Sequence, residues 1–119
     1  MEPTKKICLC AAGIDVDDAL ERLMGSEALL ERFLKKFLED SNYQTLCAAI
    51  REEDWDKSLS ASHALKGLSG NLSMTELYRL FTQQVTQLRA GDYAEAQAMM
   101  GEITENYERV AQAIRGCYP

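Results

Sequence analysis

Proline is almost absent from this sequence of 119 residues, and the two prolines that occur, Pro3 and Pro119, lie near its two ends. Because proline interrupts a helix more strongly than any other residue, an interior without it permits long helices. Signals for β-strands are also scarce, since Val, Ile and Thr are scattered and do not alternate with polar residues over any run. The abundant Ala, Leu, Glu and Gln are strong helix formers, so the sequence predicts an all-α fold.

Long apolar runs and an excess of basic residues are missing too. No stretch approaches the roughly 18 apolar residues of a membrane-spanning helix, and the run Ile7–Ala12 is shorter than the roughly 7–15 residues of a secretory signal. The formal net charge is −6. A protein of this charge gains no binding free energy from counterion release on nucleic acid, and an anionic membrane surface repels it. We therefore expect a cytoplasmic protein that binds neither nucleic acid nor membrane.

Residues for metal and nucleotide chemistry are few. The sequence has one histidine and four cysteines, of which only Cys8 and Cys10 are close in sequence. A closed zinc site needs four ligands, so we interpret the cysteines as reduced thiols and expect neither a metal nor a cofactor. No glycine pattern of a P-loop or a Rossmann fold occurs, which argues against an ATP site and autonomous kinase activity.

The sequence contains enough apolar residues for the core of one domain, since they make up 46% of the chain. We expect residues 1–13 to form a flexible N-terminal tail and residues 14–119 to form the domain. Acidic residues from Asp15 onward predict the start of a short helix that ends at Gly25.

Two long helices are predicted next, the first from apolar residues at i, i+3 and i+4 spacing and the second from an inward stripe of leucines and serines. The first covers about residues 27–52, with Ser26 as its N-cap and a kink near Ser41. The second covers residues 55–72 and has Asp54 as its N-cap.

Two capping boxes predict the last two helices. Ser73 and Glu76 would start one of them, which ends at Gly91, and Asp92 and Glu95 would start the other. Because the connections are short, neighbouring helices should be antiparallel. The sequence thus predicts an up-down-up-down four-helix bundle with a short extra N-terminal helix at one end.

The only histidine, His63, lies in the second of these long helices with a lysine and two glycines. A helix advances about 100° per residue, so His63, Lys66, Gly67 and Gly70 share one face at i, i+3, i+4 and i+7. The leucines lie mostly on another face. The imidazole is therefore expected to project into solvent.

The types of these four residues suit a reaction of the histidine with a phosphoryl group. Glycine inside a helix costs roughly 0.5–1 kcal/mol relative to alanine, so two glycines beside a histidine need a reason. Gly67 and Gly70 would leave a shallow notch through which the backbone of a partner can approach. Lys66 is a point charge suited to a phosphoryl oxygen, and an imidazole is a competent nucleophile at neutral pH.

The eleven residues that begin at His63, HALKGLSGNLS, resemble the motif of histidine-containing phosphotransfer (HPt) domains, which is close to His-x-Leu-Lys-Gly-x-Ser-x-x-Leu-Gly on a helix of a four-helix bundle. The resemblance covers about residues 14–116. It implies that His63 accepts a phosphoryl group from an aspartyl phosphate of a response-regulator receiver domain and passes it on. It also implies that Lys66 helps to place the phosphoryl group and that Gly67 and Gly70 give the receiver access.

The resemblance further implies a phosphocarrier in a multistep two-component phosphorelay, without kinase activity of its own. Its partners would be receiver domains or a hybrid histidine kinase, the receiver would supply the magnesium site, and the chain would act as a monomer. Two positions depart from the family pattern. Ser73 stands where glycine is usual, which we interpret as the start of the following helix with Asn71 tolerating any left-handed turn. Leu68 replaces a small residue and would add apolar contact surface.

Alternative interpretations stay open at this point. The chain could be a helical adaptor that binds a receiver or kinase domain without being phosphorylated. Gly70 could serve close packing between helices instead of access. Gln83 or Gln84 on the next helix could donate a hydrogen bond to the imidazole of His63.

Overall fold

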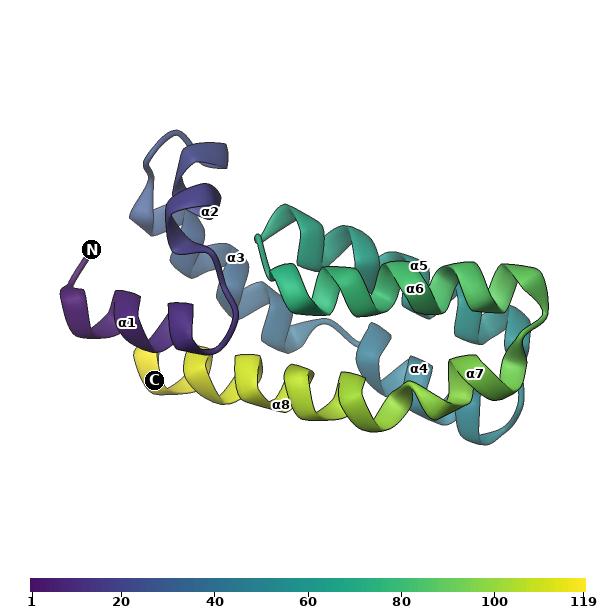
Figure 1. The fold of residues 1–119 in the computed structure, drawn as a ribbon. Helices are drawn as coiled ribbons and strands as arrows, with labels where there is room; N and C mark the ends of the chain where they lie inside the picture. Colours follow the sequence, from purple (N-terminus) through teal and green to yellow (C-terminus); the bar gives the residue numbers. More distant parts are fainter.

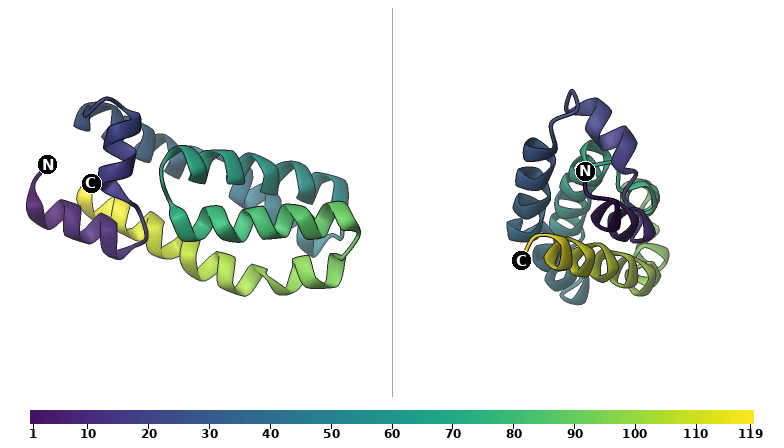
Figure 2. Two further views of the ribbon diagram at one scale, coloured as in Figure 1. Left: turned by 45° about the horizontal axis from the view of Figure 1, so that its top comes forward. Right: turned by 90° about the vertical axis from the view of Figure 1, so that its left-hand side faces the viewer.

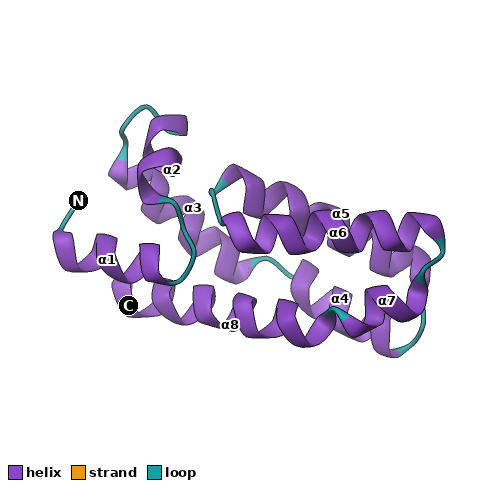
Figure 3. Cartoon of the chain, in the orientation of Figure 1, coloured by secondary structure: helices purple, strands orange, loops and turns teal.

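The computed structural model describes residues 1–119 as eight helices without a β-strand, which agrees with the predicted all-α fold (Figures 1 and 3). They are α1 (Pro3–Ala11), α2 (Val16–Arg22), α3 (Glu27–Glu39), α4 (Asn42–Arg51), α5 (Trp55–Asn71), α6 (Thr75–Ala90), α7 (Tyr93–Ala98) and α8 (Met100–Cys117). An elongated antiparallel bundle of 44 × 24 × 20 Å results, with α3–α4, α5, α6 and α7–α8 as its four sides. Helix α2 lies at one end, beside the turn that joins α5 to α6 (Figure 1).

The start of three helices is fixed by side chains that the sequence identifies correctly as N-caps. Asp15 accepts a hydrogen bond from the backbone N–H of Asp18 at 3.1 Å, and Ser26 accepts one from the N–H of Leu29 at 3.2 Å. Asp54 does the same for the third residue of α5, at 3.1 Å. Each bond satisfies an N–H group that has no partner inside the helix, and such a cap typically stabilises a helix by about 1 kcal/mol.

The side predicted as one helix over residues 27–52 is broken into α3 and α4 rather than kinked. The backbone of Asp40 is extended, with φ −70° and ψ 133°, so the helix cannot continue through it. The carboxylate of Asp40 accepts hydrogen bonds of 2.9 Å from both the backbone N–H and the side-chain amide of Asn42. The last side is also interrupted, at Met99 between α7 and α8, but the backbone of Met99 keeps helical angles, with φ −72° and ψ −17°.

Both predicted capping boxes are wrong. Neither α6 nor α7 has a side-chain cap on its first N–H groups. Ser73 is not part of α6 but follows α5 in a left-handed conformation, with φ +54°. The hydroxyl of Ser73 donates a hydrogen bond to the carboxylate of Asp18, and Glu76 pairs with Arg79.

The structure also differs from the expectation of a flexible tail over residues 1–13. Glu2 caps α1 by accepting hydrogen bonds from the N–H groups of Thr4 and Lys5, and Pro3 stands at a first-turn position that tolerates proline. Leu9 is fully buried, and α1 packs along the end of α8 (Figure 2). The apolar run is long enough to bury one face of a helix.

The core runs the length of the bundle. Its largest fully buried side chains come from every side of the bundle, from α1 and from the link between α1 and α2: Phe37, Phe81, Leu9, Ile14, Leu30, Leu34, Leu46, Leu65, Met74, Leu77, Leu80 and Ile103. Each such side chain stabilises the fold by about 1.5–3 kcal/mol relative to exposure. None of the eight helices has the length and apolar character that crossing a membrane requires.

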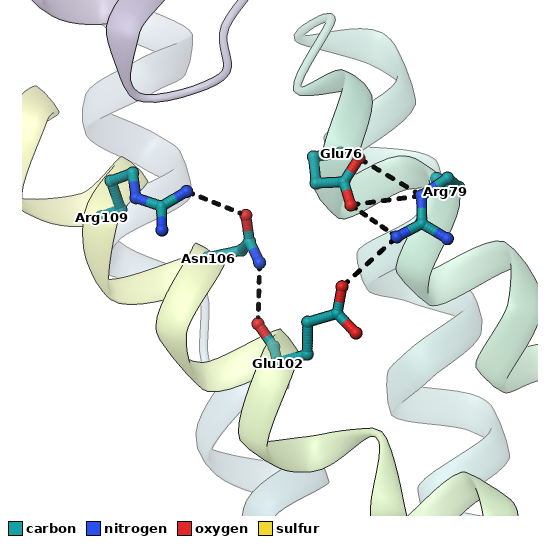
Figure 4. Close-up of polar contacts among 5 residues, drawn as sticks. All are labelled: Glu76, Arg79, Glu102, Asn106 and Arg109. Carbon is teal, nitrogen blue, oxygen red and sulfur yellow. Dashed lines mark hydrogen bonds and ion pairs between the residues drawn. The ribbon is translucent and has the colours of Figure 1, made fainter.

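A chain of polar contacts joins α6 to α8 on the surface (Figure 4). Arg79 binds Glu76 on its own helix at 2.5 Å and Glu102 of α8 at 3.4 Å, and Asn106 and Arg109 extend the chain along α8. The hydrogen bond from Arg79 lowers the pKa of Glu76. Because the charged side chains of the network are about half exposed, their ion pairs contribute little to stability compared with the core.

Candidate functional site

Helix α5 presents His63 to solvent, as its spacing predicts. Ser62 and Leu65 on either side of it face the core and are buried, whereas His63 and Gly67 are exposed and Lys66 is half-buried. The imidazole therefore projects from the middle of a helix on the side away from the leucines.

A buried polar contact directly beside His63 fixes α5 against α6. Ser62 donates a hydrogen bond of 2.8 Å to the side-chain carbonyl of Gln84, whose amide donates one of 3.0 Å to the backbone carbonyl of Ala96 in α7. Gln84 is fully buried by these contacts. The alternative that Gln84 bonds to the imidazole is thus not what the structure shows, and Gln83 is exposed on the same helix.

The four residues singled out in the sequence line one shallow pocket. Its volume is about 430 Å³, and most of the side chains around it are polar. Besides His63, Lys66, Gly67 and Gly70, the pocket is lined by Asp18, Arg22, Ser69, Asn71, Ser73, Met74, Thr75 and Tyr78. The pocket therefore extends from the histidine along α5 to the end of the bundle, where α2 closes it.

The two glycines of this face have different surroundings. A Cβ atom on Gly67 would meet no heavy atom within 4 Å, so nothing inside the chain requires glycine there. A Cβ atom on Gly70 would lie 2.9 Å from two ring carbons of Tyr78. Gly70 thus allows the Tyr78 ring of α6 to pack on the backbone of α5, which is the packing alternative rather than the access role. Gly67 is the bare position beside the histidine.

Two pocket residues from α2 could not be found by considering α5 alone. The carboxylate of Asp18 accepts a hydrogen bond of 2.6 Å from the hydroxyl of Ser73 and one of 3.0 Å from the guanidinium of Arg22. The bond from Ser73, followed by that from Arg22, lowers the pKa of Asp18. The only signal in the sequence was the replacement of the usual glycine by Ser73, which our interpretation assigned to a helix start.

Backbone pairing holds α2 in this place. The N–H of Asp15 donates to the carbonyl of Ser73 at 2.9 Å, and the N–H of Thr75 donates to the carbonyl of Gly13 at 3.2 Å. The segment between α1 and α2 therefore lies along the turn between α5 and α6. This pairing places the cation of Arg22 at the edge of the His63 pocket.

The charges around the pocket suit an anionic group although the whole chain is acidic. Lys66 and Arg22 supply two cations against the single carboxylate of Asp18, with which Arg22 is paired, so the lining keeps a net positive charge. The exposed imidazole offers a nucleophile beside them. The structure brings together no group of three or more His, Cys, Asp or Glu side chains that could hold a metal ion.

Comparison with known proteins gives one match. The family model of the Hpt domain matches residues 28–113, which extend from α3 into α8 and include His63 and the rest of α5. The search of curated proteins and the search of solved structures gave no match. Hpt domains are phosphocarrier modules of phosphorelays that interact with receiver and kinase domains. Because the match covers well over half of the chain and its helical bundle, this protein belongs to the Hpt domain family and is a histidine phosphotransfer module.

Proposed function

We propose that His63 is the phosphoacceptor and that it takes the phosphoryl group from an aspartyl phosphate of a receiver domain and passes it on. The observation that carries the proposal is the exposed imidazole next to Gly67, where a side chain would meet only open space. A receiver can bring its phosphorylated aspartate to such a ring without displacing any part of this chain.

In the transfer step, a ring nitrogen of His63 attacks the phosphorus atom. An N–P bond forms, the P–O bond to the aspartate breaks, and the carboxylate leaves with the bonding pair. The ring gives up its remaining proton to solvent or retains it until the group is passed on. Lys66 lies one turn further along α5 and lines the same pocket, so its ammonium group can neutralise the charge of the phosphoryl oxygens.

The proposed partners are receiver domains, free-standing or in a hybrid histidine kinase, and the chain acts as a monomeric carrier without kinase activity. The helical adaptor is the second candidate, because an apolar groove lies beside the site. This groove is lined by Leu23, Phe33, Leu68 and Leu72, and a partner could bind there without using the imidazole.

Phosphorylation with two donors tests the proposal. The full chain is treated with phosphoramidate and, separately, with a panel of receiver domains phosphorylated by acetyl phosphate. We expect an acid-labile label in both cases, detected as the mass of one phosphoryl group. Because the chain has a single histidine, detection of phosphohistidine assigns the label to His63.

The variant His63→Gln separates the two candidates. A phosphocarrier loses the label and the relay but still binds its receiver, whereas an adaptor keeps signalling without the histidine. A label that persists in His63→Gln, or no label from either donor, would contradict the proposed role.

A further inference from the structure

Cys8 and Cys117 both lie where the N-terminal helix α1 packs on the end of α8. Cys8 is exposed on α1, and Cys117 is the half-buried last residue of α8. The thiol of Cys117 lies 3.8 Å from the backbone carbonyl of Lys5, which is one turn before Cys8 on the same helix. The ammonium of Lys5 sits 4.5 Å from the ring centre of Tyr118, which holds the chain end against α1.

The other two cysteines are arranged differently. Cys10 is exposed two positions after Cys8, and a helix turns about 200° over two residues, so Cys10 projects from the opposite face of α1. Cys47 is half-buried on α4. Cys8 and Cys117 are thus the one pair of cysteines that α1 and α8 bring together.

We propose that Cys8 and Cys117 form a reversible disulfide when the protein meets a peroxide. The thiolate of Cys8 attacks one peroxide oxygen, the O–O bond breaks, and Cys8 becomes a sulfenic acid while hydroxide leaves. The sulfur of Cys117 then attacks that of Cys8, the S–O bond breaks, and water leaves with the proton of the Cys117 thiol. The two sulfurs have together lost two electrons, and the peroxide has been reduced to water.

The different exposure of the two thiols indicates which cysteine reacts with the peroxide first. Cys8 is the exposed thiol and meets the oxidant first. Burial, followed by the contact with Cys8, raises the pKa of Cys117, so its thiolate is scarce and it acts as the resolving thiol. An added thiol reverses the reaction by exchange.

The cross-link would fasten α1 to the bundle. It joins residues near the two ends of the chain, and a cross-link that closes so long a loop restricts the unfolded chain strongly. We therefore expect the thermal unfolding midpoint to rise by several degrees on oxidation and to return on reduction. The proposal does not rest on phosphotransfer, and its test needs no phosphoryl donor.

The experiment uses the reduced full chain and hydrogen peroxide in small molar excess. We expect a monomer that has lost two hydrogen atoms, and trypsin without reductant should release residues 7–22 linked to residues 116–119. Because residues 7–22 contain both Cys8 and Cys10, variants locate the bond. Cys10→Ser, the matched exposed control on α1, should keep the cross-link and the midpoint shift, whereas Cys8→Ser should lose both.

Three results would overturn the inference. One is a loop between Cys8 and Cys10 without the C-terminal peptide, another is a disulfide-linked dimer, and the third is oxidation to sulfinic acid with no link. Circular dichroism of reduced Cys8→Ser should match that of the unaltered protein, because the replaced side chain is exposed.

Discussion

At the scale of single residues, the two glycines of α5 show that the same residue type can serve two purposes on one helix face. Gly70 is required by the ring of Tyr78, whereas Gly67 has open space where a Cβ would be. Since glycine costs roughly 0.5–1 kcal/mol in a helix, Gly67 lowers stability without an internal benefit. Its benefit is expected at the encounter with a partner.

This contrast predicts that Gly67→Gln blocks transfer from a receiver while the fold keeps its stability. The glutamine projects beside His63 and hinders a docked partner, but unfolding in urea should change by no more than about 1 kcal/mol, because glutamine is the better helix former. Stopped-flow or gel-based transfer rates provide the measurement. The control Gly67→Ala adds only a methyl group and should transfer more nearly normally. Normal transfer by Gly67→Gln would mean that no partner approaches over this position.

A second residue-scale prediction concerns the buried contact beside His63. Ser62→Ala removes the donor to the side-chain carbonyl of Gln84, which is fully buried. A buried acceptor without a partner costs about 1–3 kcal/mol, so we expect a loss of that size in urea unfolding. Ser58→Ala is the matched control, because the Ser58 hydroxyl donates only to the carbonyl of Asp54, the N-cap of its own helix. Equal losses in the two variants would show that the link to Gln84 contributes nothing special.

At the scale of the helices, the sequence predicts features that depend on neighbouring residues of one helix. It does not predict features that depend on contacts between segments far apart in sequence. The face of His63 follows from the period of one helix, and the caps Asp15, Ser26 and Asp54 each act within three residues. The role of Ser73 could not be found in this way, because its hydroxyl bonds to Asp18 in α2, far away in sequence. The helical packing of α1 was missed for the same reason, since it depends on a surface that α8 provides.

The hydrogen bond between Ser73 and Asp18 of α2 predicts how two substitutions of Ser73 rank in stability. Ser73 has φ +54°, a conformation that costs a residue with a Cβ roughly 1–2 kcal/mol and costs glycine almost nothing. Ser73→Gly loses the bond to Asp18 but gains this relief, so its stability should stay close to that of the unaltered protein. Ser73→Ala loses the bond without the relief and should be the less stable of the two by about 1 kcal/mol. The reverse order in urea unfolding would refute this account.

The same bond has a pH signature. The pKa of Asp18 lies below its ordinary value in the folded protein, so its contribution to stability is complete above the ordinary aspartate pKa of about 3.9 and disappears as the pH falls through the lower, folded value. Carboxyl NMR should find the pKa of Asp18 higher in both Ser73 variants, because the largest cause of its lowering is gone. An unchanged pKa would show that Ser73 does not bind this carboxylate in solution.

At the scale of the whole molecule, helix α2, which lies outside the matched region, contributes to the pocket around His63. The match to the family begins at residue 28, yet Asp18 and Arg22 of α2 line the same pocket as His63. The chain carries a net charge of −6, whereas Arg22 and Lys66 outnumber the one carboxylate of this pocket, Asp18. Such an arrangement favours one orientation of an anionic partner surface and repels others.

The charge of Arg22 at the α2 side of the pocket should therefore govern the encounter with a receiver but not the chemistry at the imidazole. We predict that Arg22→Glu slows transfer from a phosphorylated receiver, more strongly at low salt than at high salt, and leaves phosphorylation by phosphoramidate unchanged, because that donor is too small to reach both His63 and α2. Arg89→Glu makes the same charge change at the far end of α6, away from α2, and should leave both rates near normal. Equal slowing by the two variants would show that only the net charge of the chain matters. Slower labelling of Arg22→Glu by phosphoramidate would show that Arg22 takes part in the reaction at His63 itself.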